Sequence, residues 1–165
     1  MKKFIYILIL SVSFSFLSQA QEIATNAIGV RIGSYNSFLG ELSYQRGLSD
    51  SDRLEFNLGL KSSNKDIDSY KFTTLYQWVW YIDDRFYWYA GAGAGFGIWE
   101  NDVKNDAFNG NFLFATGDIG LEYSFCDTPL ILSLDYRPEM YFSDYKEKNR
   151  DNFRGNIGLG IKFRF

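Results

Sequence analysis

The sequence contains no histidine among its 165 residues, and it has only one cysteine and two prolines. A serine hydroxyl needs a general base such as histidine before it can act as a nucleophile at neutral pH. The absence of histidine therefore excludes hydrolases and acyltransferases that depend on such a base. Glu122, Asp135 and Glu139 are candidates for acid–base chemistry between carboxylates, but we interpret them as parts of a structural salt-bridge network. We expect no enzyme activity and no cofactor.

The single cysteine, Cys126, excludes a disulfide within the chain. It is the first residue of a short predicted connection, and we interpret it as a tolerated turn residue. A reactive or pairing thiol is the alternative. The segment 100–111 is rich in aspartate and asparagine, but its spacing matches no calcium-binding loop. We therefore expect no metal site.

Long hydrophobic runs are also missing, apart from one at the start of the chain. Two lysines precede an apolar-dominated run over residues 4–17, and a Ser-Gln-Ala triplet follows it. This order is typical of a secretory signal peptide. Residues 1–20 are therefore predicted to be a cleaved signal peptide and residues 21–165 a single domain. That domain has 15 basic and 20 acidic residues, and this excess of acid argues against nucleic acid as a partner.

The domain shows a marked alternation of apolar with polar residues. In the clearest internal case, Leu54, Phe56, Leu58 and Leu60 alternate with polar residues or glycine, and the last thirteen residues, 153–165, alternate in the same way. A period of two indicates β-strands with one apolar and one polar face. Eight segments have this character, and no helical period competes with them: about 26–34, 38–48, 54–61, 70–82, 85–98, 112–125, 130–142 and 153–165.

Two of these segments carry further information about their faces. Leu75 and Val79 fall on the nominally polar face of segment 70–82, which makes its facing less certain. In segment 85–98, four glycines at every second position, 91–97, share one face. Glycines in a strand allow a close approach, so this stripe is predicted to make room for bulky neighbours.

The connections between the segments alternate in length. Those at 49–52, 83–84 and 126–129 are short, whereas those at about 62–69, 100–111 and 143–152 are longer and hydrophilic. The first connection, 35–37, is an exception in being short. Short turns at one rim, long loops at the other and an even number of strands are typical of bacterial outer-membrane barrels. We therefore predict an all-β fold, an eight-stranded antiparallel up-and-down transmembrane barrel.

The polar face of the strands carries few charges, interleaved with glycine, serine and asparagine, whereas a face in water is usually denser in charge. We therefore place this face in the lumen and set aside Arg53, Lys71 and Arg85 as residues at strand ends. Six acids and six bases remain, a balance suited to an interior in which buried charges must pair. The predicted lumen residues are Arg31, Glu41, Glu55, Lys61, Asp118, Glu122, Asp135, Arg137, Glu139, Arg154, Lys162 and Arg164. We expect a plugged interior.

Aromatic residues gather near both ends of the predicted strands. Such belts are expected where rings lie at the two levels of lipid headgroups. The predicted belt at the short turns contains Trp78, Trp80, Phe86, Trp88, Tyr123, Phe125 and Phe163, and the belt at the long loops contains Phe38, Phe72, Trp99, Phe142 and Phe153.

The chain resembles the family of small eight-stranded outer-membrane barrels typified by outer-membrane proteins A and X, from Asn26 to Phe165. The most specific element is the terminal strand, where Phe163 and Phe165 are similar to the signal that the barrel assembly machinery reads. The resemblance implies export to the outer membrane, with the long loops outside and both termini in the periplasm. It also implies lipid, lipopolysaccharide and the assembly machinery as partners. We expect a structural or surface-interaction role, with an unidentified extracellular partner bound through the loops.

Two alternatives remain open at the level of the sequence. One is a narrow channel or small-solute transporter of the outer membrane. The other is a secreted soluble barrel that binds an apolar ligand, which requires the apolar faces of the strands to point inward.

Overall fold

The structure, a computed structural model, describes residues 23–33, 40–63, 67–101, 108–142 and 152–165, with side chains described outside 61–68 and 99–109. The predicted signal peptide and the first loop lie outside these residues. The strands are β1 (Asn26–Gly33), β2 (Gly40–Gly47), β3 (Asp52–Ser63), β4 (Ile67–Asp83), β5 (Phe86–Asn101), β6 (Phe108–Ser124), β7 (Leu130–Tyr141) and β8 (Phe153–Arg164). In these parts of the chain no helix is long and apolar enough to cross a membrane.

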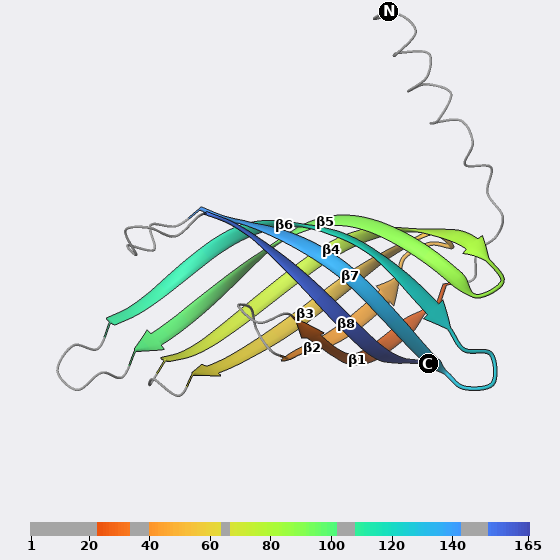
Figure 1. Ribbon diagram of the computed structural model, residues 1–165, viewed down its shortest axis with the longest axis horizontal. Coiled ribbons are helices and arrows are strands. Elements are labelled where there is room, and N and C mark those ends of the chain that lie inside the picture. The colour runs from red at the N-terminus through yellow and green to blue at the C-terminus, as the bar shows by residue number, and fades with distance from the viewer. Residues whose placement is uncertain (1–22, 34–39, 64–66, 102–107, 143–151) are drawn as a thin grey trace, which may run out of the picture.

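The eight strands form one closed antiparallel barrel in sequence order, with β8 paired to β1 (Figure 1). This confirms the predicted fold and the predicted closure of the terminal strand against the first. The backbone pairing can be followed once round the wall, and it returns to β8 ten residues from its start: Arg164, Ala27, Gln45, Glu55, Leu75, Gly93, Thr116, Glu139, Arg154. A stagger of this size in eight strands corresponds to a tilt of roughly 40° and a bore that side chains fill.

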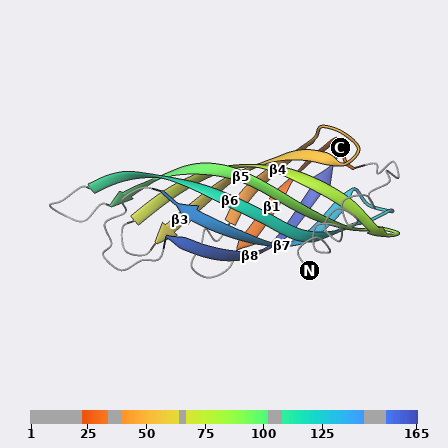
Figure 2. The same cartoon turned by 90° about the horizontal axis from the view of Figure 1, so that it is seen from above.

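The two ends of the barrel differ only partly as predicted. β3 ends at Ser63 and β4 begins at Ile67, so the predicted long connection 62–69 comprises only residues 64–66, and the first connection, predicted as a short exception at 35–37, comprises residues 34–39. The C-terminus and the short connections lie at one end, here the turn end, and the strand ends that lead into the other connections lie at the opposite end, the loop end (Figures 1 and 2). β4, β5 and β6 have 16 or 17 residues, whereas β1 and β2 have 8. As a result β4–β6 reach farther at the loop end than their neighbours do (Figure 1).

The distribution of polar and apolar side chains is the inverse of that in a water-soluble protein. Nineteen polar or charged residues are buried among the described ones, against six hydrophobic residues. Along β7 the exposed residues include Leu132, Leu134, Tyr136 and Met140, while the buried ones between them include Ser133, Asp135, Arg137 and Glu139. The apolar faces therefore point outward, which contradicts the alternative of a soluble barrel with an apolar interior.

The inner wall also contains a few large apolar side chains. Leu75 and Val79 on β4 are almost completely buried, so the two residues on the nominally polar face do point into the lumen. A Cβ atom on Gly95 would overlap the ring of Phe114, and one on Gly97 would overlap the ring of Phe112. Two of the four glycines in the stripe on β5 therefore make room for phenylalanines of β6, in agreement with the sequence prediction.

Aromatic rings pack against one another on the hairpin of β4 and β5 at the turn end. The indoles of Trp80 and Trp88 stack with their centroids 4.2 Å apart, and the rings of Phe86 and Tyr123 lie 4.8 Å apart. These contacts agree with an aromatic belt at this end. Phe38 and the side chain of Trp99, predicted for the other belt, lie outside the described residues.

The ladder between β6 and β7 is interrupted at Pro138. Its pairs run to Thr116 and Glu139 on the loop side and resume at Ile119 and Tyr136 on the turn side. Proline has no N–H to donate, which accounts for a break within a strand. The hydroxyl of Thr116 donates to the carbonyl of Gly117 at 2.9 Å, so this carbonyl beside the break keeps a partner.

Candidate functional site in the lumen

The lumen holds most of the charged residues that the sequence places there. Nine of the predicted twelve are no more than 5% exposed: Arg31, Glu41, Glu55, Asp118, Glu122, Asp135, Arg137, Glu139 and Lys162. Arg154 and Arg164 are half-buried near the two ends of β8. The side chain of Lys61 lies outside the described ones.

Two buried charges were missed by the sequence prediction. Arg53 and Lys71 were set aside as strand-end residues, yet they are 3% and 2% exposed and belong to the lumen. The reason is that β4 begins at Ile67, so Lys71 lies within it, and that β4 continues alongside β3 as far as the start of that strand. Arg53 shares the inward period of Glu55, and that signal could have identified it. Arg85 does lie in a turn, where it meets the exposed Asp84 at 3.8 Å.

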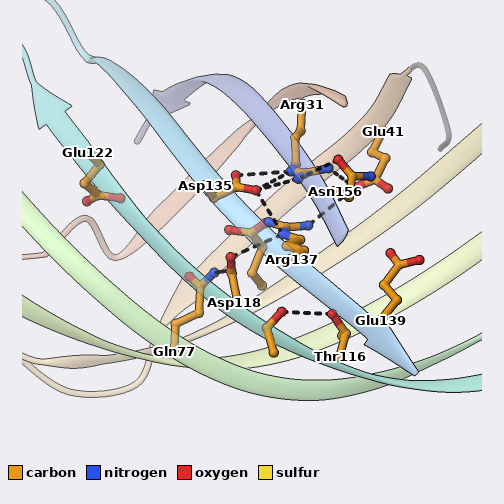
Figure 3. A network of polar contacts seen from close by, with 12 residues as sticks. Arg31, Glu41, Gln77, Thr116, Asp118, Glu122, Asp135, Arg137, Glu139 and Asn156 are labelled. Atoms are coloured by element: carbon orange, nitrogen blue, oxygen red, sulfur yellow. Dashed lines mark hydrogen bonds and ion pairs between the residues drawn. The ribbon is translucent and has the colours of Figure 1, made fainter. Parts of the chain in front are cut away.

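Arg137 of β7 is the centre of the network. Its guanidinium lies 2.5 Å from a carboxylate oxygen of Glu55. It also lies 3.4 Å from Glu41, 3.4 Å from Asp118 and 3.5 Å from Asp135 (Figure 3). These carboxylates come from β2, β3, β6 and β7 itself. A planar guanidinium with five N–H donors can contact several carboxylates at once, which an ammonium group cannot match.

Arg31 of β1 forms a second centre beside Arg137. Its Nε donates to Asp135 at 2.9 Å, and its other nitrogens reach Glu41 at 3.5 Å and the amide oxygen of Asn156 at 3.3 Å (Figure 3). The guanidinium lies against Gly158 of β8, where a Cβ atom would overlap it. The glycine on the polar face of the terminal strand thus makes room for an arginine of the first strand.

Toward the loop end, Lys71 joins two carboxylates on opposite sides of the bore. Its Nζ lies 3.0 Å from Glu41 and 2.8 Å from Glu139. The hydroxyl of Tyr141 donates to Glu139 at 2.5 Å, and the guanidinium of Arg154 lies over the Tyr141 ring at 5.0 Å. The predicted lumen residue Arg154 therefore contacts an aromatic ring at the end of the network.

Toward the turn end, Arg53 pairs with Glu122 at 2.7 Å and donates to the amide oxygen of Gln77 at 2.7 Å. Gln77 in turn donates to Asp118, which contacts Arg137. Polar contacts therefore run without interruption from Glu122 near the turn end to Tyr141 near the loop end. Buried apolar residues also lie on the inner wall near the turn end: Ala27, Val79, Tyr89 and Ile131.

The buried charges do not balance completely. Six acids, those predicted, are buried with five bases among the described side chains. The bases are Arg31, Arg53, Lys71, Arg137 and Lys162, which differs from the predicted set of six. Within the same part of the chain, no group of three or more histidine, cysteine, aspartate or glutamate side chains is arranged to hold a metal ion. Cys126 is exposed.

Comparison with known proteins finds that the structure is similar to solved structures of small β-barrels. No protein-family model matches the sequence, and no curated protein matches it. The N-terminal β-barrel domain of Pseudomonas aeruginosa OprF matches with a TM-score of 0.69 and 17% identity, over 89% of this chain and 100% of that one. The fold is that of the small outer-membrane β-barrels. The resemblance that the sequence indicates is thus confirmed for the fold.

Two other small barrels match in the same way. Neisserial surface protein A has a TM-score of 0.61 at 14% identity, over 85% of this chain and 94% of that one. Ail, the attachment invasion locus protein of Yersinia pestis, has a TM-score of 0.57 at 14% identity, over 88% of this chain and 99% of that one. Identities this low show the shared barrel alone.

The residues of the predicted assembly signal lie on the outer face of β8 at the turn end. Phe163 and Phe165 are 48% and 66% exposed, and they are the last two aromatic residues of the chain. The amide of Phe165 donates to the carbonyl of Asn26 at 2.9 Å, so the terminal residue continues the seam between β8 and β1. Both rings are therefore accessible from outside the closed barrel.

Proposed function

We propose that the protein is a non-enzymatic integral barrel of the bacterial outer membrane with a closed, charge-filled lumen. One observation carries this proposal: the apolar side chains face outward all round the wall, while the charges inside contact one another from end to end. An outward apolar face is stable only in lipid, where a closed barrel also satisfies every backbone hydrogen bond. Paired charges in a narrow bore leave no open path for solutes.

The closed lumen gives the first test of the proposal. Purified protein refolded into planar bilayers is expected to give no discrete conductance steps, because Arg137 and Lys71 hold carboxylates from opposite walls together. A pore-forming protein added to the same bilayer is the positive control. Reproducible single-channel steps from the purified protein would contradict the closed lumen and favour a narrow channel instead.

The second part of the proposal is a structural or surface-interaction role through the loop end. This role is supported by the unequal heights of the strands at the loop end of the barrel. β6 pairs with β5 from Phe108 onward, whereas its first residue with a β7 partner among the described ones is Phe114. β4 to β6 thus form a sheet that rises above the rest of the rim. The names of two similar barrels, a surface protein and an attachment invasion locus protein, refer to such roles for those proteins.

This role requires the loop end to face the cell exterior, with both termini in the periplasm. Lipid and lipopolysaccharide would then surround the wall, and the assembly machinery would meet the exposed rings of Phe163 and Phe165 during insertion. An extracellular partner would meet the raised sheet. These partners follow from the proposed location and share its test.

An epitope tag placed within residues 102–107 is expected to bind antibody on intact cells, because these residues connect β5 and β6, whose ends reach farthest at the loop end. The matched control is the same tag between Asp50 and Ser51 in the short turn after β2, which should bind antibody only after the outer membrane is permeabilised. Immunofluorescence or flow cytometry measures both. The reverse pattern of staining would overturn the proposed orientation and, with it, the surface role.

A further inference from the structure

Three polar side chains form a row on the inner wall of β2, β3 and β4. Ser43 pairs directly with Asn57, and Asn57 pairs directly with Thr73. All three point into the lumen and are 0%, 1% and 3% exposed. Directly opposed residues in antiparallel strands have Cβ atoms about 5 Å apart, so the polar tips of this row lie close together.

The row has no hydrogen-bond partner within the protein. The hydroxyl oxygens of Ser43 and Thr73 are unpartnered, and so are both the oxygen and the nitrogen of the Asn57 amide. Buried side-chain polar atoms nearly always have a hydrogen-bond partner. A buried polar atom without a hydrogen bond carries the full free-energy cost of its removal from water. Four such atoms in three adjacent residues therefore point to a bound species between them.

The neighbouring charges do not supply the missing partners. Glu41 lies diagonally across from Asn57 on β2, and Glu55 lies two residues before it on β3. Both carboxylates are held by Arg137, and Glu41 is also held by Lys71. On the far side of Thr73 the next position in the row is Gly95, whose face is covered by the ring of Phe114. The row thus lies beside ion pairs, and it ends at Gly29 beyond Ser43 and at an apolar ring beyond Thr73.

The chemistry of Asn57 identifies the missing species. Its amide oxygen must accept a hydrogen bond and its amide nitrogen must donate one. A cation could satisfy only the oxygen, and it would lie near Arg137 and Lys71. An anion could satisfy only the nitrogen, and it would lie near Glu41 and Glu55. Water both donates and accepts, and a buried water makes two to four hydrogen bonds.

We propose that Ser43, Asn57 and Thr73 form an internal hydration site, in which ordered water bridges the three side chains inside the lumen. Such water joins β2, β3 and β4 on their inner side in addition to the backbone ladder. The site goes beyond the proposed function, because it depends only on the geometry of the interior.

The direct test is solution NMR of the wild-type barrel in detergent micelles, deuterated and labelled with ¹⁵N-asparagine. The side-chain amide of Asn57 is expected to show cross-peaks to water with the sign of a long-lived bound molecule. The absence of such cross-peaks would overturn the proposal. A saturable shift of the amide resonances on titration with sodium chloride or sodium bromide would also overturn it, because it would identify an ion at the site.

The stability of two variants provides a second test, because substitutions in the row change the urea midpoint in opposite directions when water is present and when it is absent. Asn57→Leu keeps the volume but removes both amide groups, and Thr73→Val removes only a hydroxyl. If water fills the site, each variant lowers the urea midpoint of unfolding, because the water and the remaining groups lose partners. In a dry row each variant raises the midpoint, which would refute the site. Thr74→Val, one residue away on the outer face of β4, is the matched control and should leave the midpoint unchanged.

Discussion

Replacing Arg137 with methionine is expected to lower the free energy of unfolding by about 3–5 kcal/mol, the usual cost of removing one partner from a buried ion-pair network. The guanidinium lies within 3.5 Å of four carboxylates, from Glu41, Glu55, Asp118 and Asp135. Without it, these negative charges face one another in a bore from which water is largely excluded. Methionine fills a similar length but offers no positive charge.

Unfolding of the refolded barrel by urea in lipid vesicles, followed by the fluorescence of its four tryptophans, measures this loss. The matched control is Arg46→Met, because Arg46 is exposed on the outer side of β2 and, within the described part of the chain, donates to Asn26 at an exposed position. The control should change the unfolding free energy by less than about 1 kcal/mol. Equal effects of the two substitutions would show that Arg137 does not organise the interior. If Arg137→Met does not fold, Arg137→Lys retains the charge and should be intermediate in stability.

The second large effect is expected on the outer face, where Leu58→Arg should destabilise the barrel by about 2–4 kcal/mol in lipid vesicles. Leu58 lies in the central part of β3 with its side chain outward, and it is 44% exposed to the surroundings of the barrel. If those surroundings are hydrocarbon, an arginine there must be taken out of water. If they are water, the same arginine is almost without cost.

Leu48→Arg is the matched control for this substitution. Leu48 follows β2 in a short connection and is 53% exposed, so the two leucines hardly differ in exposure and differ mainly in their distance from the barrel ends. We expect Leu48→Arg to be nearly neutral. The pair of unfolding curves therefore reports the position of the bilayer, and equal stability of the two variants would contradict a membrane-spanning wall.

The strands and their facing could be predicted because an apolar outer face and a narrow polar bore impose a period of two on almost every segment. Leu54 to Leu60 alternate cleanly, and the structure turns these leucines and Phe56 outward. The glycine stripe on β5 was informative for the same reason, because a missing side chain on the inner face can only be compensated by a neighbour. Phe114 supplies that compensation, but the sequence does not show which of the two neighbouring strands provides it or in which register.

The membership of the lumen was harder to predict than the strands. Arg53 and Lys71 were excluded because the ends of β3 and β4 were placed too far inward in the sequence. The tilt of the strands brings a residue near the end of one strand beside the middle of another, and this shift follows from the stagger of the closed barrel and not from any single segment. The partners of Arg137 lie up to 96 residues away in the chain, as for Glu41, so no local pattern could indicate them.

The interruption at Pro138 changes the significance of the central ion pairs. Arg137 is the residue just before this proline, and Asp118 follows Gly117 on the facing strand, where the backbone ladder of β6 and β7 has no pair. The Nε of Arg137 lies 3.4 Å from Asp118 on the inner side of that gap. At this height the two strands are held by side-chain charge where backbone hydrogen bonds are missing. The contents of the lumen therefore complete the wall as well as fill it.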